Sequence, residues 1–105
     1  MDKKVCALVT GACGGLGRAF VKILAKNKEN LILTGTSEKK LKELLDEFNE
    51  DFKDLFVKTV VCDLSKKEDR ENLLNEITNS KLVVNKLINN AGVIVEGDIF
   101  NFSNE

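Results

Sequence analysis

The chain has 105 residues and a formal net charge of −1, because 16 Lys and Arg oppose 17 Asp and Glu. This length predicts one domain, and the balanced charge argues against binding to nucleic acid or to an anionic membrane, which both favour a basic excess. No apolar run approaches the roughly 20 residues of a membrane-spanning helix. The first residues show no signal-peptide pattern, so we expect a cytoplasmic protein.

The residue types that the sequence lacks restrict its chemistry. It contains no His, Tyr, Trp or Pro, which excludes any mechanism that depends on a histidine base. Its three cysteines, Cys6, Cys13 and Cys62, are widely spaced and form no CxxC pair. This arrangement predicts neither a disulfide framework nor a zinc site, and no metal is expected.

Strands and helices are expected to alternate along the first half of the chain. The apolar run Lys4–Thr10 is typical of a strand buried on both faces. A glycine-rich segment and a helical pattern follow it. The residues expected to form the apolar stripe of that helix are Leu16, Ala19, Phe20, Ile23 and Leu24. The helix is expected to end within residues 27–30, before a second buried strand at residues 31–34.

The alternation continues in the second half. Ser37 is expected to cap a helix, whose apolar stripe is Leu41, Leu44, Leu45 and Phe48. A third strand is expected at residues 56–62, and Ser65 and Glu68 fit a capping box at the next helix. The apolar positions of that helix are Leu73, Leu74 and Ile77. A fourth strand at residues 82–89 completes an α/β pattern that predicts a parallel sheet with right-handed crossovers.

The glycine-rich segment after the first strand predicts a nucleotide site. Four glycines lie within seven residues, at Gly11, Gly14, Gly15 and Gly17, which is more than a tight turn needs. A glycine loop at a helix N-terminus binds anions, because backbone N–H groups and the helix dipole point at the same place. The spacing fits neither the GxxxxGK loop of NTPases nor a strict GxGxxG fingerprint, since Phe20 stands at the last glycine position.

With this loop the chain resembles the short-chain dehydrogenases/reductases, whose motif TGxxxGxG is met by Thr10, Gly11, Gly15 and Gly17. Gly14 also fits the TGxxGxxG spacing of an epimerase-like branch. The run from Asn89 to Gly92, Asn-Asn-Ala-Gly, matches the core-length reductase branch, which includes 3-oxoacyl-carrier-protein reductases. The resemblance covers essentially the whole chain. It implies a Rossmann-like, doubly wound parallel sheet in the order 3-2-1-4, truncated after about four strands.

The resemblance also implies which residues bind the cofactor. Asp63 stands where the family places an acid that hydrogen-bonds the adenine amino group, and Thr10 where it braces the glycine turn. Asn89 and Asn90 end a buried strand, and their amides need partners, which favours a fixed network beside the cofactor. The expected cofactor-binding residues are Thr10, Gly11, Gly15, Leu16, Gly17, Thr36, Ser37, Asp63, Leu64, Asn90, Ala91 and Gly92.

NADP(H) is the expected cofactor, with NAD as the second choice. NAD sites usually place Asp or Glu at the end of the second strand, where it accepts a hydrogen bond from the ribose 2′-hydroxyl. Gly35 occupies that position here, so no carboxylate repels a 2′-phosphate. Thr36 and Ser37 are able to donate hydrogen bonds, and Lys39 or Lys40 adds positive charge at the helix start.

The catalytic residues of the family are missing from the chain. The resemblance implies the family's chemistry, which is hydride transfer between a nicotinamide and a carbonyl or alcohol. The family uses a Ser, a Tyr and a Lys for this reaction. The chain has no Tyr, and Ser103 follows the fourth strand too closely to be the family's serine. We therefore expect residues 1–105 to be the N-terminal dinucleotide-binding part of such an enzyme, inactive alone. A small carbonyl or alcohol substrate is expected only for the longer enzyme.

A second hypothesis is a complete, non-enzymatic module that binds a dinucleotide or dimerises, and the missing Tyr fits it equally. In either case the fourth strand lacks its usual neighbour and lies at an edge of the sheet. Its apolar residues and those at positions 93–95 then lack their usual cover, so we expect self-association. The strand residues concerned are Val83, Val84, Leu87 and Ile88.

Overall fold

A computed structural model describes residues 3–90, so the expected site residues Ala91 and Gly92 lie outside the described part of the chain. Strands and helices alternate as the sequence predicts. Their bounds are β1 (Lys4–Thr10), α1 (Gly15–Lys26), β2 (Asn30–Gly35), α2 (Glu38–Glu47), β3 (Val57–Val61), α3 (Lys67–Asn79) and β4 (Leu82–Asn89). The bounds of β1 and β4 are the predicted ones, and those of β2 and β3 differ by one residue at each end.

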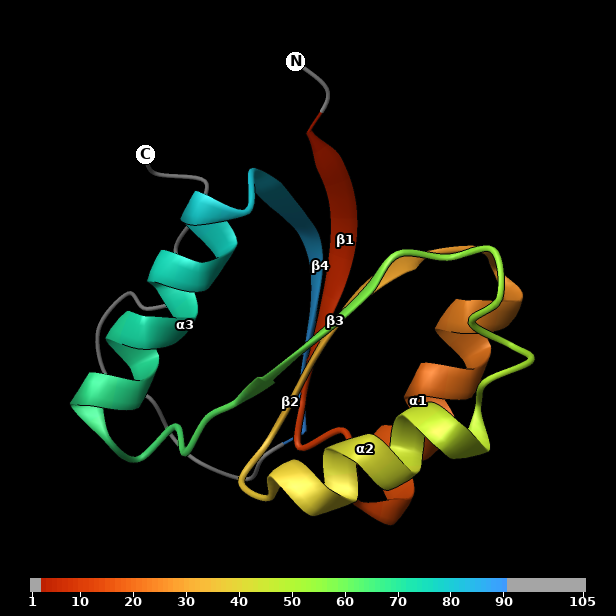
Figure 1. Ribbon diagram of the computed structural model, residues 1–105, viewed down its shortest axis with the longest axis horizontal. Coiled ribbons are helices and arrows are strands. Elements are labelled where there is room, and N and C mark those ends of the chain that lie inside the picture. The colour runs from red at the N-terminus through yellow and green to blue at the C-terminus, as the bar shows by residue number, and fades with distance from the viewer. Residues whose placement is uncertain (1–2, 91–105) are drawn as a thin grey trace.

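The four strands form one parallel sheet in the order β3-β2-β1-β4. This order confirms the predicted Rossmann-like arrangement. Helices α1 and α2 lie on one side of the sheet and α3 on the other (Figure 1). Because the strands are parallel, their carboxyl ends meet at a single edge of the sheet, where an open α/β sheet places its ligands.

The core has two parts, one on each face of the sheet. β1 contributes to both, because its side chains alternate between the faces and those of residues 6–9 are fully buried. Ala7 and Val9 pack toward α1 and α2 with Leu31, Leu33 and Leu44. On the other face, the residues that pack with α3 are Cys6, Leu8, Ile32, Val60, Leu73 and Ile77. The continuous apolar pattern of β1 therefore follows from its central place in a covered sheet.

The predicted apolar stripe of α1 is wrong. Leu16 and Ile23 are 62% and 55% exposed, and the buried face is instead formed by Gly17, Val21, Leu24 and Ala25. Gly17 packs directly against the backbone of the preceding loop, and this close approach sets the rotation of the helix about its axis. Of the predicted stripe, only Leu24 is fully on the core side. The stripe predicted for α2 is confirmed, since its leucines and Phe48 pack in the core.

β4 pairs with β1, and among the described residues it has no other strand neighbour. The pairing holds a β-bulge at Asn85, because Cys6 lies opposite Val84 whereas Ala7 lies opposite Lys86. Val83 and Leu87 remain 38% and 39% exposed. Within residues 3–90, β4 therefore forms an edge strand, as the sequence predicts. Of its four apolar residues expected to lack cover, Val83 and Leu87 are exposed, whereas Val84 and Ile88 pack against the core.

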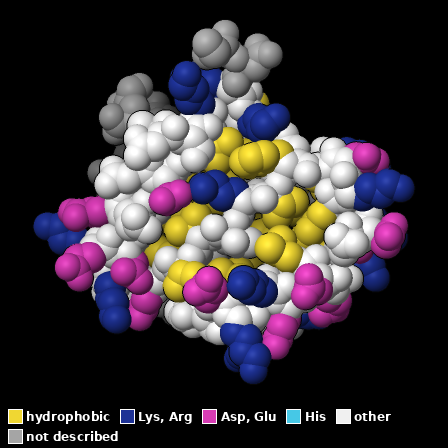
Figure 2. Space-filling view, viewed as in Figure 1, with side chains coloured by type: hydrophobic (Ala, Val, Ile, Leu, Met, Phe, Trp, Pro, Cys, Tyr) yellow, Lys and Arg dark blue, Asp and Glu magenta, His cyan; other side chains and the backbone are white. Residues whose placement is uncertain are grey.

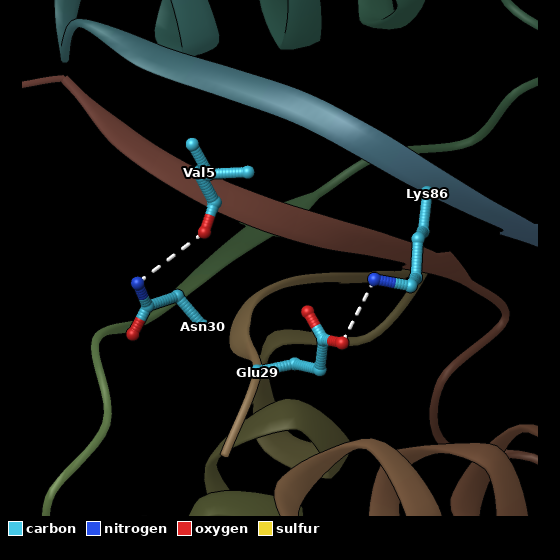
Figure 3. Close-up of polar contacts among 4 residues, drawn as sticks. All are labelled: Val5, Glu29, Asn30 and Lys86. Carbon is cyan, nitrogen blue, oxygen red and sulfur yellow. Dashed lines mark hydrogen bonds and ion pairs between the residues drawn. The ribbon is translucent and has the colours of Figure 1, made fainter. Parts of the chain in front are cut away.

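Three polar contacts join the strands toward the end opposite the cavity, and Figure 3 shows two of them. The Asn30 side chain donates to the Val5 carbonyl at 3.3 Å and accepts from the Phe56 N–H at 3.0 Å. Glu29, just before β2, pairs with Lys86 of β4 at 2.8 Å. These contacts link β1, β2, β4 and the segment leading into β3, and so stabilise the strand register at this end.

The face seen in Figure 1 carries β3 in front. From the same side, Figure 2 shows hydrophobic side chains gathered in the middle of the face and charged side chains around its rim. β3 is the other edge strand of the described sheet, and its Val61 is 45% exposed. Within residues 3–90, no helix is long and apolar enough to cross a membrane.

Candidate functional site

A cavity of about 340 Å³ lies at the carboxyl ends of the strands. Segments that follow β1, β2, β3 and β4 all contribute to its wall, as the topology of a parallel sheet requires. The residues that line it are Gly11, Cys13, Gly14, Thr34, Gly35, Thr36, Ser37, Lys40, Cys62, Asp63, Leu64 and Asn90. Six of these belong to the set predicted from the sequence: Gly11, Thr36, Ser37, Asp63, Leu64 and Asn90.

The glycine loop after β1 needs glycine at two positions for reasons of geometry. Gly11 adopts a φ of 62°, in the left-handed region that other residues rarely occupy. A Cβ on Gly17 would lie 2.1 Å from the Gly11 carbonyl oxygen, so a side chain there would push α1 away from the loop. By contrast, a Cβ on Gly15 meets no protein atom within 4 Å. The open space at Gly15 leaves the helix N-terminus accessible.

The N-terminus of α1 has free hydrogen-bond donors. Gly14 is its N-cap and supplies no side chain, and the first turn contains no acidic residue. The first backbone N–H to be paired within the helix is that of Arg18, with the Gly14 carbonyl at 2.8 Å. Among the described residues, the N–H groups of Gly15, Leu16 and Gly17 have no hydrogen-bond partner. Together with the helix dipole they form a ready binding site for an anion.

α2 begins differently. The Ser37 hydroxyl oxygen accepts a hydrogen bond from the Lys40 N–H at 3.2 Å, which confirms the predicted N-cap. Glu38 adds a negative charge in the first turn. The helix that follows the glycine loop therefore begins without a side-chain cap and without an acidic residue in its first turn, whereas the next helix along the chain has both.

Thr10, Asn89 and Asn90 form one network that joins β1 to β4. The buried Thr10 hydroxyl donates to Asn89 Oδ1 at 2.8 Å and accepts from the Asn90 N–H at 2.9 Å. The Asn90 side-chain amide donates to the Gly11 carbonyl at 3.4 Å. The network predicted for these amides is therefore present, and it fixes the glycine turn to the end of β4.

The end of β2 contributes polar groups to a second part of the cavity wall. Thr34 lines the cavity, and its hydroxyl is buried without a hydrogen-bond partner among the described residues. A buried hydroxyl of this kind normally has a partner, so the wall fits a ligand that supplies one. Gly35 follows, and a Cβ there would meet Cys13 Sγ at 3.5 Å, an ordinary contact distance. Lys40 reaches the same cavity from the first turn of α2.

The segment after β3 forms the third wall. Asp63 Oδ1 accepts from both the Ser65 N–H, at 3.0 Å, and the Ser65 hydroxyl, at 2.6 Å. These two bonds lower the pKa of the Asp63 carboxyl, the hydroxyl bond contributing most. The predicted capping box is therefore wrong: Lys66 is the N-cap of α3 and makes no side-chain cap bond. The Ser65 hydroxyl bonds Asp63 instead, since Ser65 stands one residue before the N-cap of the helix.

The cysteines are free thiols in the described residues. Burial raises the pKa of the Cys62 thiol to about 11, with the charges of Asp69 and Asp63 adding to the effect. Burial also raises the pKa of Cys13, although Arg18 opposes the shift. Arg18 forms an ion pair with Glu47 that joins α1 to α2. No group of three or more potential metal ligands occurs within residues 3–90.

The predicted site residues thus fall into four groups. Six line the cavity. Thr10 and Gly17 are buried and shape the loop, whereas Gly15 and Leu16 are exposed in the first turn of α1. The last two, Ala91 and Gly92, lie outside the described residues.

The sequence-based set also omits six residues that line the cavity: Cys13, Gly14, Thr34, Gly35, Lys40 and Cys62. The sequence analysis uses Gly35 and Lys40 only to argue which cofactor is preferred. The others were detectable by their position, because each lies within two residues of a predicted site residue.

The chain matches known proteins along nearly its whole length. A family model described as short chain dehydrogenase matches residues 5–105. The chain is 38% identical over 87 residues to the 3-oxoacyl-(acyl-carrier-protein) reductase FabG of Rickettsia typhi, which covers 83% of this chain and 32% of that protein. It is 42% identical over 92 residues to the very-long-chain 3-oxoacyl-CoA reductase of Kluyveromyces lactis, covering 86% of this chain and 26% of that protein.

A solved structure shows the same fold. The structure of a variant of actinorhodin polyketide ketoreductase with NADPH matches with a TM-score of 0.73 and 29% identity, covering 88% of this chain and 34% of that one. In each case the matched region is about a third or less of the relative. The chain therefore spans only part of the length of these reductases.

Proposed function

Because the chain belongs to the short-chain dehydrogenase family, we propose that its described residues hold the adenosine and phosphate part of NADP(H) for a carbonyl or alcohol oxidoreductase. One observation carries the proposal: the uncapped N-terminus of α1 follows a glycine loop that lines a cavity at the carboxyl ends of the strands. When bound, the cofactor's nicotinamide supplies or accepts the hydride. The residues of this chain bind and orient the other end of the cofactor.

The diphosphate is assigned to the first turn of α1. The N–H groups of Gly15, Leu16 and Gly17 supply donors, and the absence of a side chain at Gly15 leaves room for the anion. The Thr10 network ties the start of the loop to the end of β4, so these donors are fixed before the cofactor binds. Preformed donors improve affinity because little conformational entropy is lost on binding.

The adenine is assigned to the wall formed by Asp63 and Leu64. Asp63 Oδ1 is engaged by Ser65, and among the described residues Oδ2 has no hydrogen-bond partner. An ionised carboxylate with one open oxygen suits the adenine amino group, which only donates. Leu64 and Asn90 line the same cavity and complete this part of the site. Ala91 and Gly92 remain predictions from the sequence.

The 2′-phosphate of NADP(H) is assigned to the end of β2. Gly35 leaves the position of the usual NAD-binding acid empty, and Thr36, Ser37 and Lys40 line the cavity beside it. The sequence leaves Lys39 and Lys40 as alternatives. Only Lys40 lines the cavity, so we assign the positive charge to Lys40. The NADPH-bound ketoreductase that the chain resembles supports this preference.

Calorimetric titration of the 105-residue chain with NADPH and NADH tests the assignment. We expect NADPH to bind more tightly, and Gly35→Asp to reverse the order, since the structure accommodates a Cβ at this position. Lys40→Gln should weaken NADPH by about tenfold, the typical cost of a hydrogen bond to a charged group, while leaving NADH unchanged. Lys39→Gln is the matched control because it removes the same charge outside the cavity. Tighter binding of NADH by the unmodified chain would overturn the NADP(H) preference.

We further propose that the chain alone does not turn over substrate. Its sequence has no Tyr, and it covers only 32% of the Rickettsia reductase. On this proposal the catalytic Ser, Tyr and Lys belong to a longer product, as does the pocket for the carbonyl or alcohol. An immunoblot of source cells tests it: a band at more than twice 11.7 kDa supports a longer enzyme. A band at 11.7 kDa supports the alternative, a non-enzymatic module.

We also propose self-association and a cytoplasmic location. β4 presents the partly exposed Val83 and Leu87 at an edge of the described sheet, and such edges pair readily with other strands. Light scattering at rising concentration checks this, and a constant monomer mass would contradict it. Free thiols at all three cysteines suit a reducing compartment.

A further inference from the structure

The first turn of α3 contacts the backbone behind the proposed adenine wall. The Asp69 carboxylate accepts a hydrogen bond from the Asp63 N–H at 2.8 Å. The Arg70 guanidinium donates to the Leu64 carbonyl at 2.9 Å. Neither side chain lines the cavity, so both act on the wall from its far side.

These contacts differ from ordinary helix capping. In a capping box the acid at the third helical position accepts from the N–H of the N-cap residue. Asp69 is the third residue of α3, but its carboxylate passes the N-cap, Lys66, and reaches Asp63 three residues earlier. The bond therefore fixes the loop that follows β3 rather than the end of the helix.

Further polar contacts hold the same loop. The Asp63 carbonyl accepts from the Lys66 N–H at 2.9 Å, and the Cys62 thiol contacts the Asp69 carbonyl oxygen at 3.5 Å. The Cys62 N–H extends the pairing with β2 through the Gly35 carbonyl at 2.8 Å. The backbone of Asp63 is therefore held on both sides, and its side chain is oriented by the two bonds from Ser65 to Oδ1.

We propose that Asp69 and Arg70 are positioning residues that set base recognition by holding Asp63 and Leu64 in place. The inference rests on the proposed function, in which Asp63 accepts from the adenine amino group. Bonds with an ionised partner are stronger than neutral ones, and both bonds here have one. A small movement of the Asp63 backbone would turn its carboxylate away from the base, so the effect should appear in base selectivity.

Selectivity is measured with two cofactors that differ only at the base. NADPH carries an amino group on the adenine, and its reduced hypoxanthine analogue carries a carbonyl oxygen there. The ratio of their dissociation constants for the 105-residue chain reports the contact with Asp63. We expect a ratio on the order of tenfold in favour of NADPH, the scale of a hydrogen bond to a charged group, and a ratio near one for Asp63→Ala.

Asp69→Ala and Arg70→Ala should each bring the ratio toward one, and Asp69→Asn, which keeps an acceptor oxygen, should restore much of it. Glu68→Ala is the matched control, because it removes an acidic side chain from the same turn and should leave the ratio unchanged. Circular dichroism identifies any variant that does not fold, and the folded variants decide. A merely structural role would weaken both cofactors equally and preserve the ratio.

The outcomes separate the two proposals. An unchanged ratio in folded Asp69→Ala and Arg70→Ala overturns the positioning role while the proposed function stands. Equal binding of both cofactors by the unmodified chain, or an unchanged ratio in Asp63→Ala, overturns the adenine assignment itself. If the alanine variants do not fold, Asp69→Leu and Arg70→Met take their place, because they remove the acceptor and the donor and keep the size of the side chain, and wild-type ratios in both overturn the positioning role.

Discussion

Replacing Gly17 with alanine tests whether close packing of α1 against the glycine loop fixes the site. The added Cβ would lie 2.1 Å from the Gly11 carbonyl oxygen and 3.0 Å from Ala12 Cα. Both neighbours are backbone atoms, so no side-chain rotation relieves the overlap. Overpacking of this kind costs about 1–3 kcal/mol, and the backbone contact places it near 3. Alanine recovers about 1 kcal/mol through its helix propensity, which leaves a net loss of about 2 kcal/mol.

The matched control is Gly15→Ala, which adds the same atom to the same helix where no protein atom lies within 4 Å. It should change the free energy of unfolding by no more than about 0.5 kcal/mol. The assay is urea unfolding followed by far-ultraviolet circular dichroism, because the chain has no Trp or Tyr to serve as a fluorescent probe. If Gly17→Ala is as stable as Gly15→Ala, the packing argument for Gly17 is refuted.

Three further predictions concern single side chains. Ser65→Ala should raise the pKa of Asp63, which carboxyl NMR measures. Because bonds from Ser65 lower that pKa in the folded chain, they contribute to stability at neutral pH. This contribution to stability is lost as the pH falls through the pKa of Asp63. NADPH should slow alkylation of Cys13, which lines the cavity, whereas buried Cys62 should stay unreactive; equal labelling with and without NADPH would contradict this. Thr10→Val should lower stability by about 1–3 kcal/mol in urea unfolding, since two partners lose their bonds, and no loss would show the network to be dispensable.

Most of the fold could be predicted because its signals are local. The buried strands are continuous apolar runs, and Ser37 and the leucines of α2 define a capped amphipathic helix. The buried face predicted for α1 is wrong because the orientation of the helix depends on the close approach of Gly17 to the glycine loop. A Cβ on Gly17 would lie 2.1 Å from the Gly11 carbonyl oxygen. Hydrophobic periodicity detects only positions with apolar side chains, and Gly17 has no side chain. The pattern therefore predicts that Leu16 and Ile23 are buried.

The position of a candidate site residue was predictable where it lies at the end of a strand, as for Thr10, Asp63 and Asn90. It was not predictable where one side chain has two possible partners. The Ser65 hydroxyl is able either to cap α3 or to bond the Asp63 carboxylate, and the sequence pattern is the same for both. Asp69 was missed for the same reason, since nothing in its spacing distinguishes a bond to the N-cap from a bond to a residue three places earlier.

The bulge in β4 gives the strand one residue more than its span requires. Cys6 and Ala7 are adjacent in β1, but their partners Val84 and Lys86 are separated by Asn85. Deletion of Asn85 would therefore leave every paired residue opposite its present partner, including Asn89 opposite Thr10. A β4 shortened at Asn85 would therefore keep Asn89 in register with Thr10 at the carboxyl end of the sheet.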